Sequence, residues 1–557
     1  MIRFLLSLFV PFRWFIEKMG ADYSQFIRIL RLKLTLDDRR MKGLAKNQQK
    51  ATGNMLLKQS LVQIFMGTIF MSFLIIIKSA FTFFFFAHLF VMIMMAMMII
   101  SEFTTILFDT SENVIVQPLP IKGNTQSLAR NAHVFLYLTL IAFNISILSI
   151  VVAIVKFGFL AGLIFISTIL LNVLFTLFLA NILYLAIMRL ASGEQLKNVL
   201  MYFQIVIAIV FMAAYQFGLN MVDKSVIKDM VLPVHWYTYL VPPAFFSGLI
   251  EAFSSMNFDL QHLIFIAEGL IVPLVAIYFT GKYLTPVFNR KLMDLEQGDR
   301  SSKVKVIRNK KDYWYRFSSR VFVRNSEERS AFKLMWKMTG RERLFKQSFF
   351  PSIGYILIMV IMPFFKKSFN LDELVQGDMY LLILYVFLMV AATLSGSMSI
   401  GNNQHAGWMF RVLPAESPSI YFKGFIKAAF VRFFIPIYAL LGIILCLVWG
   451  IKILPDVLIA LMSIYLFTLL FYYNGQPVFP FASEKIATQG GAAVAKFFSI
   501  MLIAVAVGFM HQFLIHWFDF ANLLLIPVYV GAIFYVNRFY VYRKITWKVV
   551  DRMNSYS

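Results

Sequence analysis

The chain has 557 residues, of which 60% are hydrophobic and 14% charged, with a formal net charge of +24 and a single cysteine, Cys446. Soluble proteins carry roughly a quarter charged residues, so this composition excludes an ordinary soluble protein, and the lone cysteine excludes an intrachain disulfide and a thiolate metal cluster. The apolar residues come in blocks of about 20, the length of a helix that crosses a bilayer, and predict an all-α polytopic membrane protein.

The N-terminal segment is basic and amphipathic. Residues 1–58 carry 12 Lys and Arg against 4 acids, and the first apolar run stops at Pro11 without a small-residue cleavage site. We interpret the N-terminus as an amphipathic helix on the inner membrane face, with Phe and Trp in lipid and Arg and Lys in water. The charge pattern favours a cytoplasmic location under the positive-inside rule over nucleic-acid binding, which needs a soluble basic module with base-reading groups.

Twelve apolar stretches then follow in two sets of six. The first set is predicted to span the membrane at 60–77, 80–100, 134–155, 160–187, 200–219 and 262–280. The second set is predicted at 349–365, 379–399, 426–449, 454–473, 495–513 and 521–538. The turns at Lys78 and Lys156 must be very short.

The second set echoes the first. LLKQSLVQIFMGTIFMSFLI at 56–75 is matched by LFKQSFFPSIGYILIMVIMP at 344–363. We therefore predict two repeats of six spans with cytoplasmic interfacial helices. They divide the chain into a first repeat at 1–280 (N-terminal interfacial helices plus six spans), a cytoplasmic linker with an interfacial helix at 281–348, and a second repeat with a short basic tail at 349–557. Residues 281–349 hold 18 Lys and Arg against 7 acids, which places them, and both termini, in the cytoplasm.

The loops 101–133 and 400–425 form the most specific pair. Each runs from the end of a second span to a Leu-Pro dipeptide, Leu119-Pro120 or Leu413-Pro414, and then offers a new helix start. Two such inside segments can dock into equivalent clefts of a cytoplasmic partner. The alternative is that they are ordinary reconnecting loops that look alike because the halves arose by duplication.

Polar residues within the spans are candidates for a transport pathway. Glu268 is an acid at membrane depth, where it faces a cavity or partner or, near the span's outer boundary, simply reaches water. Asn172 and Gln204 line a pathway or serve as hydrogen-bonding links between helices. His511 and His516 are five residues apart, a spacing unlike the four-residue spacing of a helical zinc pair, and are interpreted as interfacial. No metal site is expected.

The outer insert at 220–261 contains LPVHWYTYLVPPAFFSGLIEAF. Its Tyr, Trp and Pro residues are typical of a membrane interface. The pattern predicts two short helices, broken at Pro242-Pro243, that dip into the membrane and return or close the outer mouth of a pathway. The chain lacks the G-x4-G-K-[ST] string of a phosphate-binding loop, so ATP hydrolysis by this chain is not expected.

In layout, the chain resembles permease subunits of type-2 ATP-binding-cassette (ABC) exporters, in a fused two-repeat form. Residues 23–58 match the interfacial helix of such a permease half, 109–130 its coupling segment and 234–253 its outer helical pair, most of which the second half lacks. The resemblance implies a non-enzymatic permease in a bacterial plasma membrane, working with two copies of a separate ATPase that binds ATP and Mg. It implies coupling residues at Asp109, Glu112, Leu119, Pro120, Arg130, Arg411, Leu413, Pro414 and Lys423.

Two other classes remain open. One is a secondary transporter of the major-facilitator kind, which also has six plus six spans. That family carries a G-x3-D-R/K motif in a short loop between spans two and three. In this chain the same loop is long and lacks the motif. The other is a membrane enzyme acting on a lipid-linked substrate, which should show clustered acids or histidines at one membrane face. The outer insert has only scattered acids.

Overall fold

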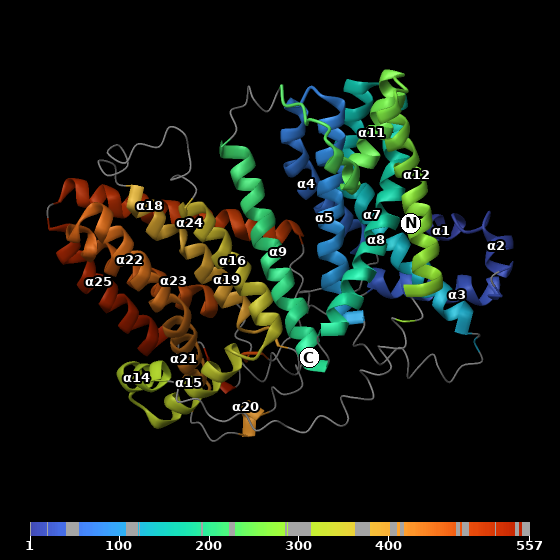
Figure 1. The fold of residues 1–557 in the computed structure, drawn as a ribbon. Helices are drawn as coiled ribbons and strands as arrows, with labels where there is room; N and C mark the ends of the chain where they lie inside the picture. The colour runs from blue at the N-terminus through green and yellow to red at the C-terminus, as the bar shows by residue number, and fades with distance from the viewer. Residues whose placement is uncertain are drawn as a thin grey trace. The chain divides into compact units, whose positions relative to one another are not determined.

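The computed structural model describes residues 2–18, 20–39, 55–106, 121, 123–190, 193–221, 229–284, 287, 313–361, 379–401, 409–412, 417–474, 479–481, 490–518, 520–540 and 545–547. Every regular element in these ranges is a helix (Figure 1). The chain divides into two compact units, the first built from residues within 1–41, 48–207 and 222–303 and the second from residues within 42–47, 208–221 and 304–557.

Among the described residues, ten helices are long and apolar enough to cross a membrane. They run over Ala80–Ile99, Leu128–Phe157, Phe159–Ile187, Leu260–Leu284, Arg343–Ile361, Tyr380–Ser397, Ser419–Trp449, Ile451–Tyr472, Ser499–Trp517 and Ala521–Phe539. Each overlaps a predicted span, so the prediction of a polytopic helical protein is confirmed at this level. The other two predicted spans, 60–77 and 200–219, are not among these ten. The first falls mostly on the helix Met55–Met71 and the 3₁₀ turn Ser72–Ile76, and the second on a helix whose apolar stretch is the shorter Asn198–Ala214.

The first unit begins with short helices. The sequence predicted one amphipathic helix at the N-terminus, but the structure has two, because the chain turns around Pro11 and proline cannot continue a helix. The elements in order are α1 (Ile2–Ser7), α2 (Arg13–Lys18), α3 (Tyr23–Arg39), α4 (Met55–Met71), η1 (Ser72–Ile76), α5 (Ala80–Ile106), α7 (Gly123–Phe157), α8 (Phe159–Leu190), α9 (Gly193–Met221, of which 208–221 group with the second unit), η2 (Trp236–Leu240), α11 (Pro242–Ser255), α12 (Leu260–Phe279) and η3 (Thr280–Leu284).

The helix α11 is the buried centre of the first unit's outer insert. It packs on α5, α8 and α12 (Figure 1). Most of its side chains from Pro243 to Ala252 are buried. Its start at Pro242 follows from sequence, because proline lacks the amide hydrogen that the first turn of a helix leaves unpaired. A Cβ on Gly248 would lie 2.3 Å from the Phe265 ring, so glycine is required for α11 to approach α12 this closely. The predicted break at Pro242-Pro243 is confirmed.

The predicted short turns are confirmed. Three residues separate η1 from α5, and Gly158 alone, with a φ of +96°, separates α7 from α8. Ser79, just before α5, is its N-cap. The Ser79 Oγ accepts a hydrogen bond from the Thr82 amide at 3.4 Å. At the neighbouring turn, Lys156 Nζ donates to the carbonyl oxygens of Ile75, at 3.1 Å, and Ile77. The lysine therefore satisfies carbonyls at the end of η1 that have no partner within the helix.

Polar pairing also joins α4 to α7, since Asn144 Nδ2 donates to Gln63 Oε1 at 2.8 Å. We expect Asn144→Leu to lower the free energy of unfolding by about 1 kcal/mol, the scale of a hydrogen bond between membrane helices. Asn181→Leu is the matched control, because Asn181 donates only within its own helix, to the Leu177 carbonyl. Denaturation in detergent measures both variants. An equal loss for the two would show that the bond between helices adds no stability.

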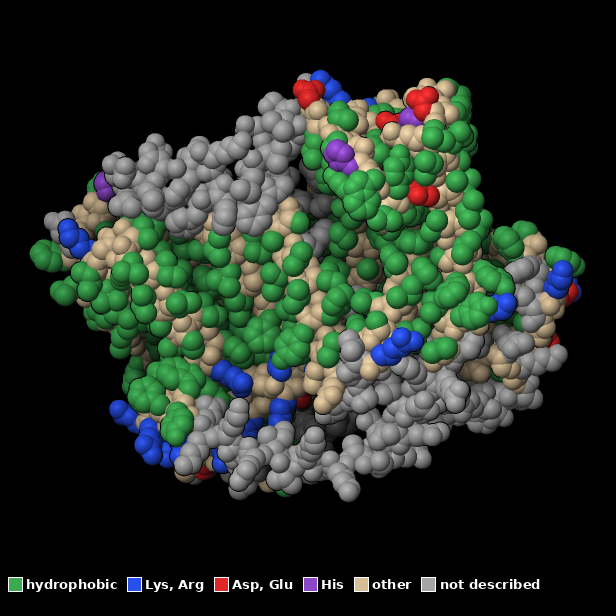
Figure 2. Space-filling model, viewed as in Figure 1, with side chains coloured by type: hydrophobic (Ala, Val, Ile, Leu, Met, Phe, Trp, Pro, Cys, Tyr) green, Lys and Arg blue, Asp and Glu red, His purple; other side chains and the backbone are tan. Residues whose placement is uncertain are grey.

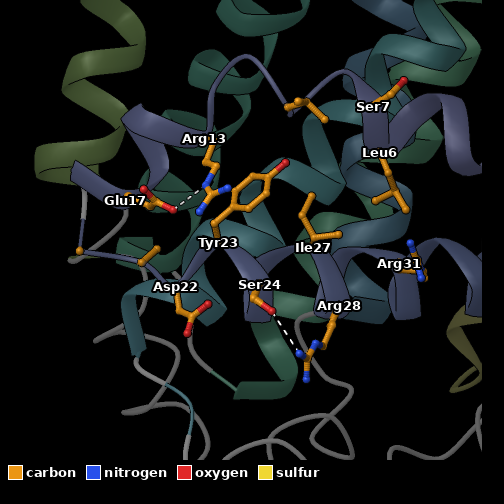
Figure 3. A pocket seen from close by; sticks show the side chains of 13 residues that line it. Leu6, Ser7, Arg13, Glu17, Asp22, Tyr23, Ser24, Ile27, Arg28 and Arg31 are labelled. Atoms are coloured by element: carbon orange, nitrogen blue, oxygen red, sulfur yellow. Dashed lines mark hydrogen bonds and ion pairs between the residues drawn. The ribbon is translucent and has the colours of Figure 1, made fainter.

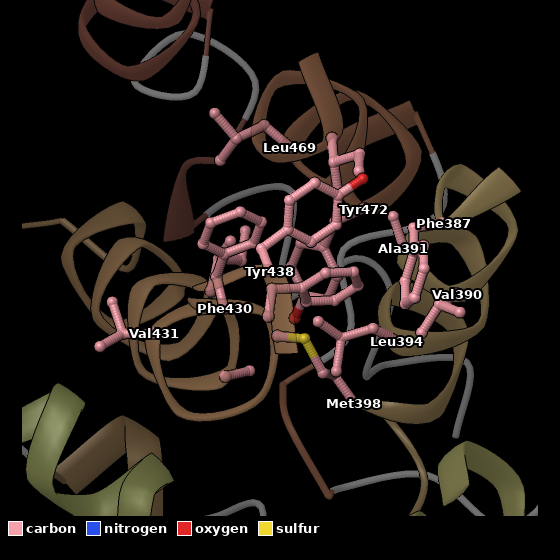
Figure 4. Packing of buried hydrophobic residues seen from close by; sticks show 14 of the residues in the cluster. Phe387, Val390, Ala391, Leu394, Met398, Phe430, Val431, Tyr438, Leu469 and Tyr472 are labelled. Atoms are coloured by element: carbon pink, nitrogen blue, oxygen red, sulfur yellow. The ribbon is translucent and has the colours of Figure 1, made fainter. Parts of the chain in front are cut away.

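The second unit is also a helical bundle, with a continuous aromatic and aliphatic core. Its elements are α14 (Tyr313–Phe322), α15 (Ser326–Thr339), α16 (Arg343–Ile361), α18 (Met379–Val386), α19 (Leu388–Ser397), α20 (Met409–Val412), α21 (Ser419–Ala429), η6 (Phe430–Phe434), α22 (Ile435–Trp449), η7 (Ile451–Ile453), α23 (Leu454–Asn474), α24 (Gly490–Trp517), α25 (Ala521–Tyr535) and η8 (Val536–Tyr540). Figure 4 shows Leu394 of α19, and Phe387 just before it, packed with Tyr438 of α22 and Tyr472 of α23. The Tyr438 hydroxyl donates to the Leu384 carbonyl, which satisfies the one polar atom of this buried ring.

Within the described ranges, three helices change to π-helical turns, at η3, η6 and η8. Each wider turn contains one basic residue, Lys282, Arg432 or Arg538. Single π turns within helices are frequently found at functional sites. Two of these basic residues, Arg432 and Arg538, belong to the arrangements described below.

Candidate functional site

The amphipathic helix α15, which precedes the first candidate span of the second unit, is docked on α21. Glu328 of α15 is 9% exposed, and its Oε1 lies 2.7 Å from Nζ of Lys427 on α21. Lys427 also donates to the Phe322 carbonyl at the end of α14, at 3.1 Å. A Cβ on Gly424 would lie 2.8 Å from the Glu328 carbonyl oxygen, so a larger residue would force the helices apart. The three helices α14, α15 and α21 thus meet at one ion pair.

Arg432, on η6, holds the other end of α15. Its guanidinium donates to the Trp336 carbonyl and, at 3.0 Å, to Thr339 Oγ1. Its Cζ lies 5.3 Å from the centre of the Trp336 ring and 5.6 Å from that of Phe433, within range of cation–π attraction. The last carbonyls of a helix have no donors within the helix, and a cation there also meets the negative end of the helix dipole. Arg432 therefore caps α15 from a helix that contains a candidate span.

The first unit has a similar joint, between α3 and α7. Phe26, Leu30 and Leu34 of α3 are at most 3% exposed and pack with Ala129 and Leu136 of α7. The spacing of four residues places the three α3 side chains on one face of the helix. At the start of α3, the Asp22 amide donates to the buried Thr125 hydroxyl of α7 at 3.1 Å. The amphipathic helix is thus attached to the helix that follows the predicted coupling segment.

The predicted coupling residues fall mostly outside the described ranges. Asp109, Glu112, Leu119, Pro120, Leu413 and Pro414 lie there, as does the side chain of Arg411. Arg130 is half-buried on α7, within the joint with α3, and Lys423 is half-buried on α21, within the joint with α15. The helix starts expected after the Leu-Pro dipeptides are confirmed, because α7 begins at Gly123 and Ser417 Oγ accepts the Ser419 amide at 3.3 Å before α21.

Among the predicted pathway residues, Asn172 lies in a buried polar cluster with His88. Asn172 Nδ2 lies 3.2 Å from His88 Nδ1 and donates to the His88 carbonyl, while His88 Nε2 lies 3.2 Å from Thr168 Oγ1. The Thr168 hydroxyl already donates to the Phe165 carbonyl. These partners fit a neutral imidazole with its proton on Nε2. Asn172 thus links α8 to α5, as the hydrogen-bonding interpretation predicted. His88 was missed, and its only signal was one polar residue inside an apolar run.

Glu268 and Gln204 lie on other helices than Asn172 and His88. Glu268 is half-buried on α12, and its Oε2 is shielded from solvent with no hydrogen-bond partner among the described residues. Gln204 is half-buried on α9. No hydrogen bond or ion pair described for the chain joins Glu268 to Asn172. The three predicted pathway residues lie on three different helices, α8, α12 and α9, and their role in a pathway stays a prediction.

The second unit contains a buried ionisable network that sequence reasoning did not anticipate. Asp456, 4% exposed at the start of α23, accepts hydrogen bonds from the Tyr380 hydroxyl at 2.9 Å and from Asn522 Nδ2 at 2.6 Å. His511, 3% exposed on α24, lies 3.2 Å from Asn522 Oδ1 through Nε2 and 2.9 Å from the Tyr385 hydroxyl through Nδ1. The His511 Nε2 to Asp456 Oδ1 distance is 3.7 Å. These contacts fit a neutral imidazole with its proton on Nε2 and an ionised Asp456 carboxylate.

The interfacial interpretation of His511 is wrong, because packing between α18, α23, α24 and α25 encloses its ring. His516, one turn further along α24, is exposed. The two histidines therefore belong to different environments. No group of three or more metal-binding side chains occurs in the part of the chain that the structure describes.

Polar contacts also hold the outer insert against the rest of the first unit. Lys78 Nζ pairs with Asp229 Oδ1 at 2.7 Å, and the Leu232 amide donates to Thr82 Oγ1 at 3.1 Å. Near the end of α11, Glu251 Oε2 lies 3.8 Å from His262 Nε2. Burial raises the pKa of the Glu251 carboxyl above its ordinary value, while His262 and the Phe81 backbone act to lower it.

A pocket of about 910 Å³ lies among the N-terminal helices of the first unit. Figure 3 shows the Arg13–Glu17 ion pair on one side of it and Arg28, bonded to Ser24, and Arg31 on another. The nearby side chains of Phe12 and Trp14 are 57% and 69% exposed. Exposed aromatics beside arginines fit the predicted interfacial placement of this segment.

No protein-family model, curated protein or solved structure matches this chain significantly.

Proposed function

We propose that the protein is the membrane-spanning permease subunit of an ATP-driven exporter, working with two copies of a separate ATPase subunit. The observation that carries the proposal is the joint in each unit between an amphipathic helix and the helix that follows a predicted coupling segment: α3 on α7, and α15 on α21. A push on residues 109–130 or 403–423 would reach these helices directly. ATP and Mg would be held by the partner, so this chain is not itself an enzyme.

A twofold repeat is supported by corresponding contacts within each unit. In the first unit, α3 packs on α7, α5 on α8, and α8 on α12. In the second, α15 packs on α21, α19 on α23, and α23 on α25. In both units, therefore, the amphipathic helix packs on the third predicted span, the second span packs on the fourth, and the fourth packs on the sixth. This correspondence supports two repeats of six spans, twelve in all. From the charge pattern and the resemblance, the proposal also places both termini in the cytoplasm and the protein in a bacterial plasma membrane.

Affinity purification in mild detergent tests the partner first. A soluble ATPase recovered at about two copies per chain would support the proposal. A clean protein without an ATPase, in several gentle detergents, would overturn it.

Replacing Leu119-Pro120 or Leu413-Pro414 with alanines tests the coupling segments. We expect ATP hydrolysis by the complex to continue while transport falls, with the protein level in the membrane unchanged, because the partner would no longer move the joints. Transport is measured in inverted vesicles with the cargo that accumulates in cells lacking the protein. Full transport by both variants would show that the coupling assignment is wrong.

A proton-coupled secondary transporter is the second candidate, favoured by the buried Asp456–His511 network. Ionisable residues within membrane helices often form proton relays. The two candidates differ in their energy source. Transport that follows an imposed pH gradient without ATP would favour the second candidate, and transport that requires ATP and the partner would favour the first.

A further inference from the structure

A pocket of about 670 Å³ lies in the second unit where α21 meets the end of α25. Lys423 and Lys427 line it from α21, Arg538 from η8, and Glu328 from α15. Three positive charges against one negative charge give the lining a formal net charge of +2. Phe534 and Phe539 form its apolar wall, and the Arg538 guanidinium lies 5.8 Å from the centre of the Phe534 ring.

The neighbouring helix α14 indicates the depth of this pocket. Tyr313, Phe317 and Val321 are 74%, 58% and 57% exposed, and their spacing of four residues makes one apolar stripe. The exposed Arg316 and Arg320 lie on other faces of α14. A helix with an exposed apolar stripe and a basic face lies in the surface layer of a bilayer. Lys427, which lines the pocket, donates to the carbonyl of Phe322, the last residue of α14. The pocket therefore lies at the same depth as α14, among the lipid headgroups.

The surface next to the pocket is suited to acyl chains. The span that contains α25 is only 6% buried within the protein. Leu524, Val528 and Phe534 are each about 60% exposed. Figure 2 shows hydrophobic side chains over the sides of the second unit's helices and Lys and Arg side chains gathered near α14 and α15. The basic lining of the pocket is therefore continuous with the exposed apolar surface of α25.

We propose that this pocket binds the phosphate headgroup of an anionic phospholipid, with its acyl chains along α25. Phosphate oxygens accept charge-assisted hydrogen bonds from Lys and Arg, and basic pockets between membrane helices on the cytoplasmic side bind anionic headgroups. A zwitterionic lipid such as phosphatidylcholine would bring an additional cation toward a lining that is already positive. The inference is independent of the proposed exporter function, because it needs only the pocket and a bilayer.

Native mass spectrometry of the delipidated full-length protein tests the proposal. Phosphatidylglycerol, phosphatidylcholine and inorganic phosphate are titrated separately. We expect phosphatidylglycerol to bind most tightly. The variant Lys423→Gln/Arg538→Gln should weaken its binding roughly thirtyfold, since each basic residue near a membrane surface contributes about a fivefold attraction for an anionic lipid. Lys333→Gln is the matched control, because Lys333 is exposed on α15 and does not line the pocket.

Several outcomes would overturn the proposal. Equal binding of phosphatidylglycerol by the double variant and the control would place the lipid elsewhere. Binding of inorganic phosphate as tightly as the lipid would make this a site for a free anion. Unchanged lipid binding with loss of a co-purifying protein would make it a protein-docking surface. Should the double variant fold poorly, Arg538→Gln alone, which alters only an exposed side chain, should still weaken phosphatidylglycerol binding about fivefold.

Discussion

Asp456→Leu should lower the free energy of unfolding of the second unit by about 2–6 kcal/mol, because each buried donor left without an acceptor costs about 1–3 kcal/mol. Asp456 accepts from both the Tyr380 hydroxyl and Asn522 Nδ2, so leucine leaves two donors unsatisfied. It also removes the carboxylate 3.7 Å from His511. Denaturation in detergent, followed by tryptophan fluorescence, measures the change, since the Trp449 ring lies 5.9 Å from that of Tyr380.

Two further variants separate the network from a general effect of mutating α23. Asp456→Asn retains one carbonyl oxygen as acceptor and should lose clearly less stability than Asp456→Leu. Ser463→Ala is the matched control, because the buried Ser463 hydroxyl on the same helix has no hydrogen-bond partner among the described residues, and its removal should be close to neutral. A loss for Asp456→Leu no larger than that for Ser463→Ala would show that the network contributes no stability.

Arg432→Leu should lower the free energy of unfolding by about 4–7 kcal/mol, since each of its two hydrogen bonds is worth about 1.5–3 kcal/mol and its cation–π attraction roughly 1 kcal/mol. The change removes the donor to the Trp336 carbonyl and to Thr339 Oγ1, so the end of α15 loses its cap. We expect α15 to detach from α21 before the rest of the unit unfolds. Trypsin should then cut faster after Lys333 and Lys337, which are exposed on α15.

Arg432→Lys is the control for charge. It keeps a cation but lacks the planar, forked guanidinium that reaches two acceptors and stacks on a ring. Its stability and its rate of cleavage in α15 should fall between those of the wild type and Arg432→Leu. Wild-type cleavage rates in Arg432→Leu would show that Arg432 does not hold α15 in place.

The candidate spans could be read from sequence because their cause is local. A helix across hydrocarbon needs about 20 consecutive apolar residues, and such a run is visible without knowing what it packs against. The same holds for the break at Pro242 and for the short turns at Lys78 and Lys156. The predictions failed where a second, local rule intervened, as at Pro11, which divides the N-terminal segment into α1 and α2.

The partners of polar residues could not be read in this way. Asn172 and His88 are 84 residues apart, and Asp456 and Asn522 are 66 apart, so no periodicity relates them. His511 was interpreted as interfacial because it lies near the end of an apolar run, yet it is enclosed by three other helices. Hydropathy measures how apolar a stretch is. It does not indicate which face of the helix meets another helix.

The sequence by itself determined that the chain is a helical, polytopic protein with basic connecting segments, because bilayer thickness and charge leave a direct mark on composition. Only the tertiary structure decided that α11 is buried among α5, α8 and α12, that Arg432 caps α15, and that Lys423 shares a pocket with Arg538. These features depend on the rotation and packing of helices distant in the chain. A buried polar group must find a partner, but only the packing of the helices selects which one.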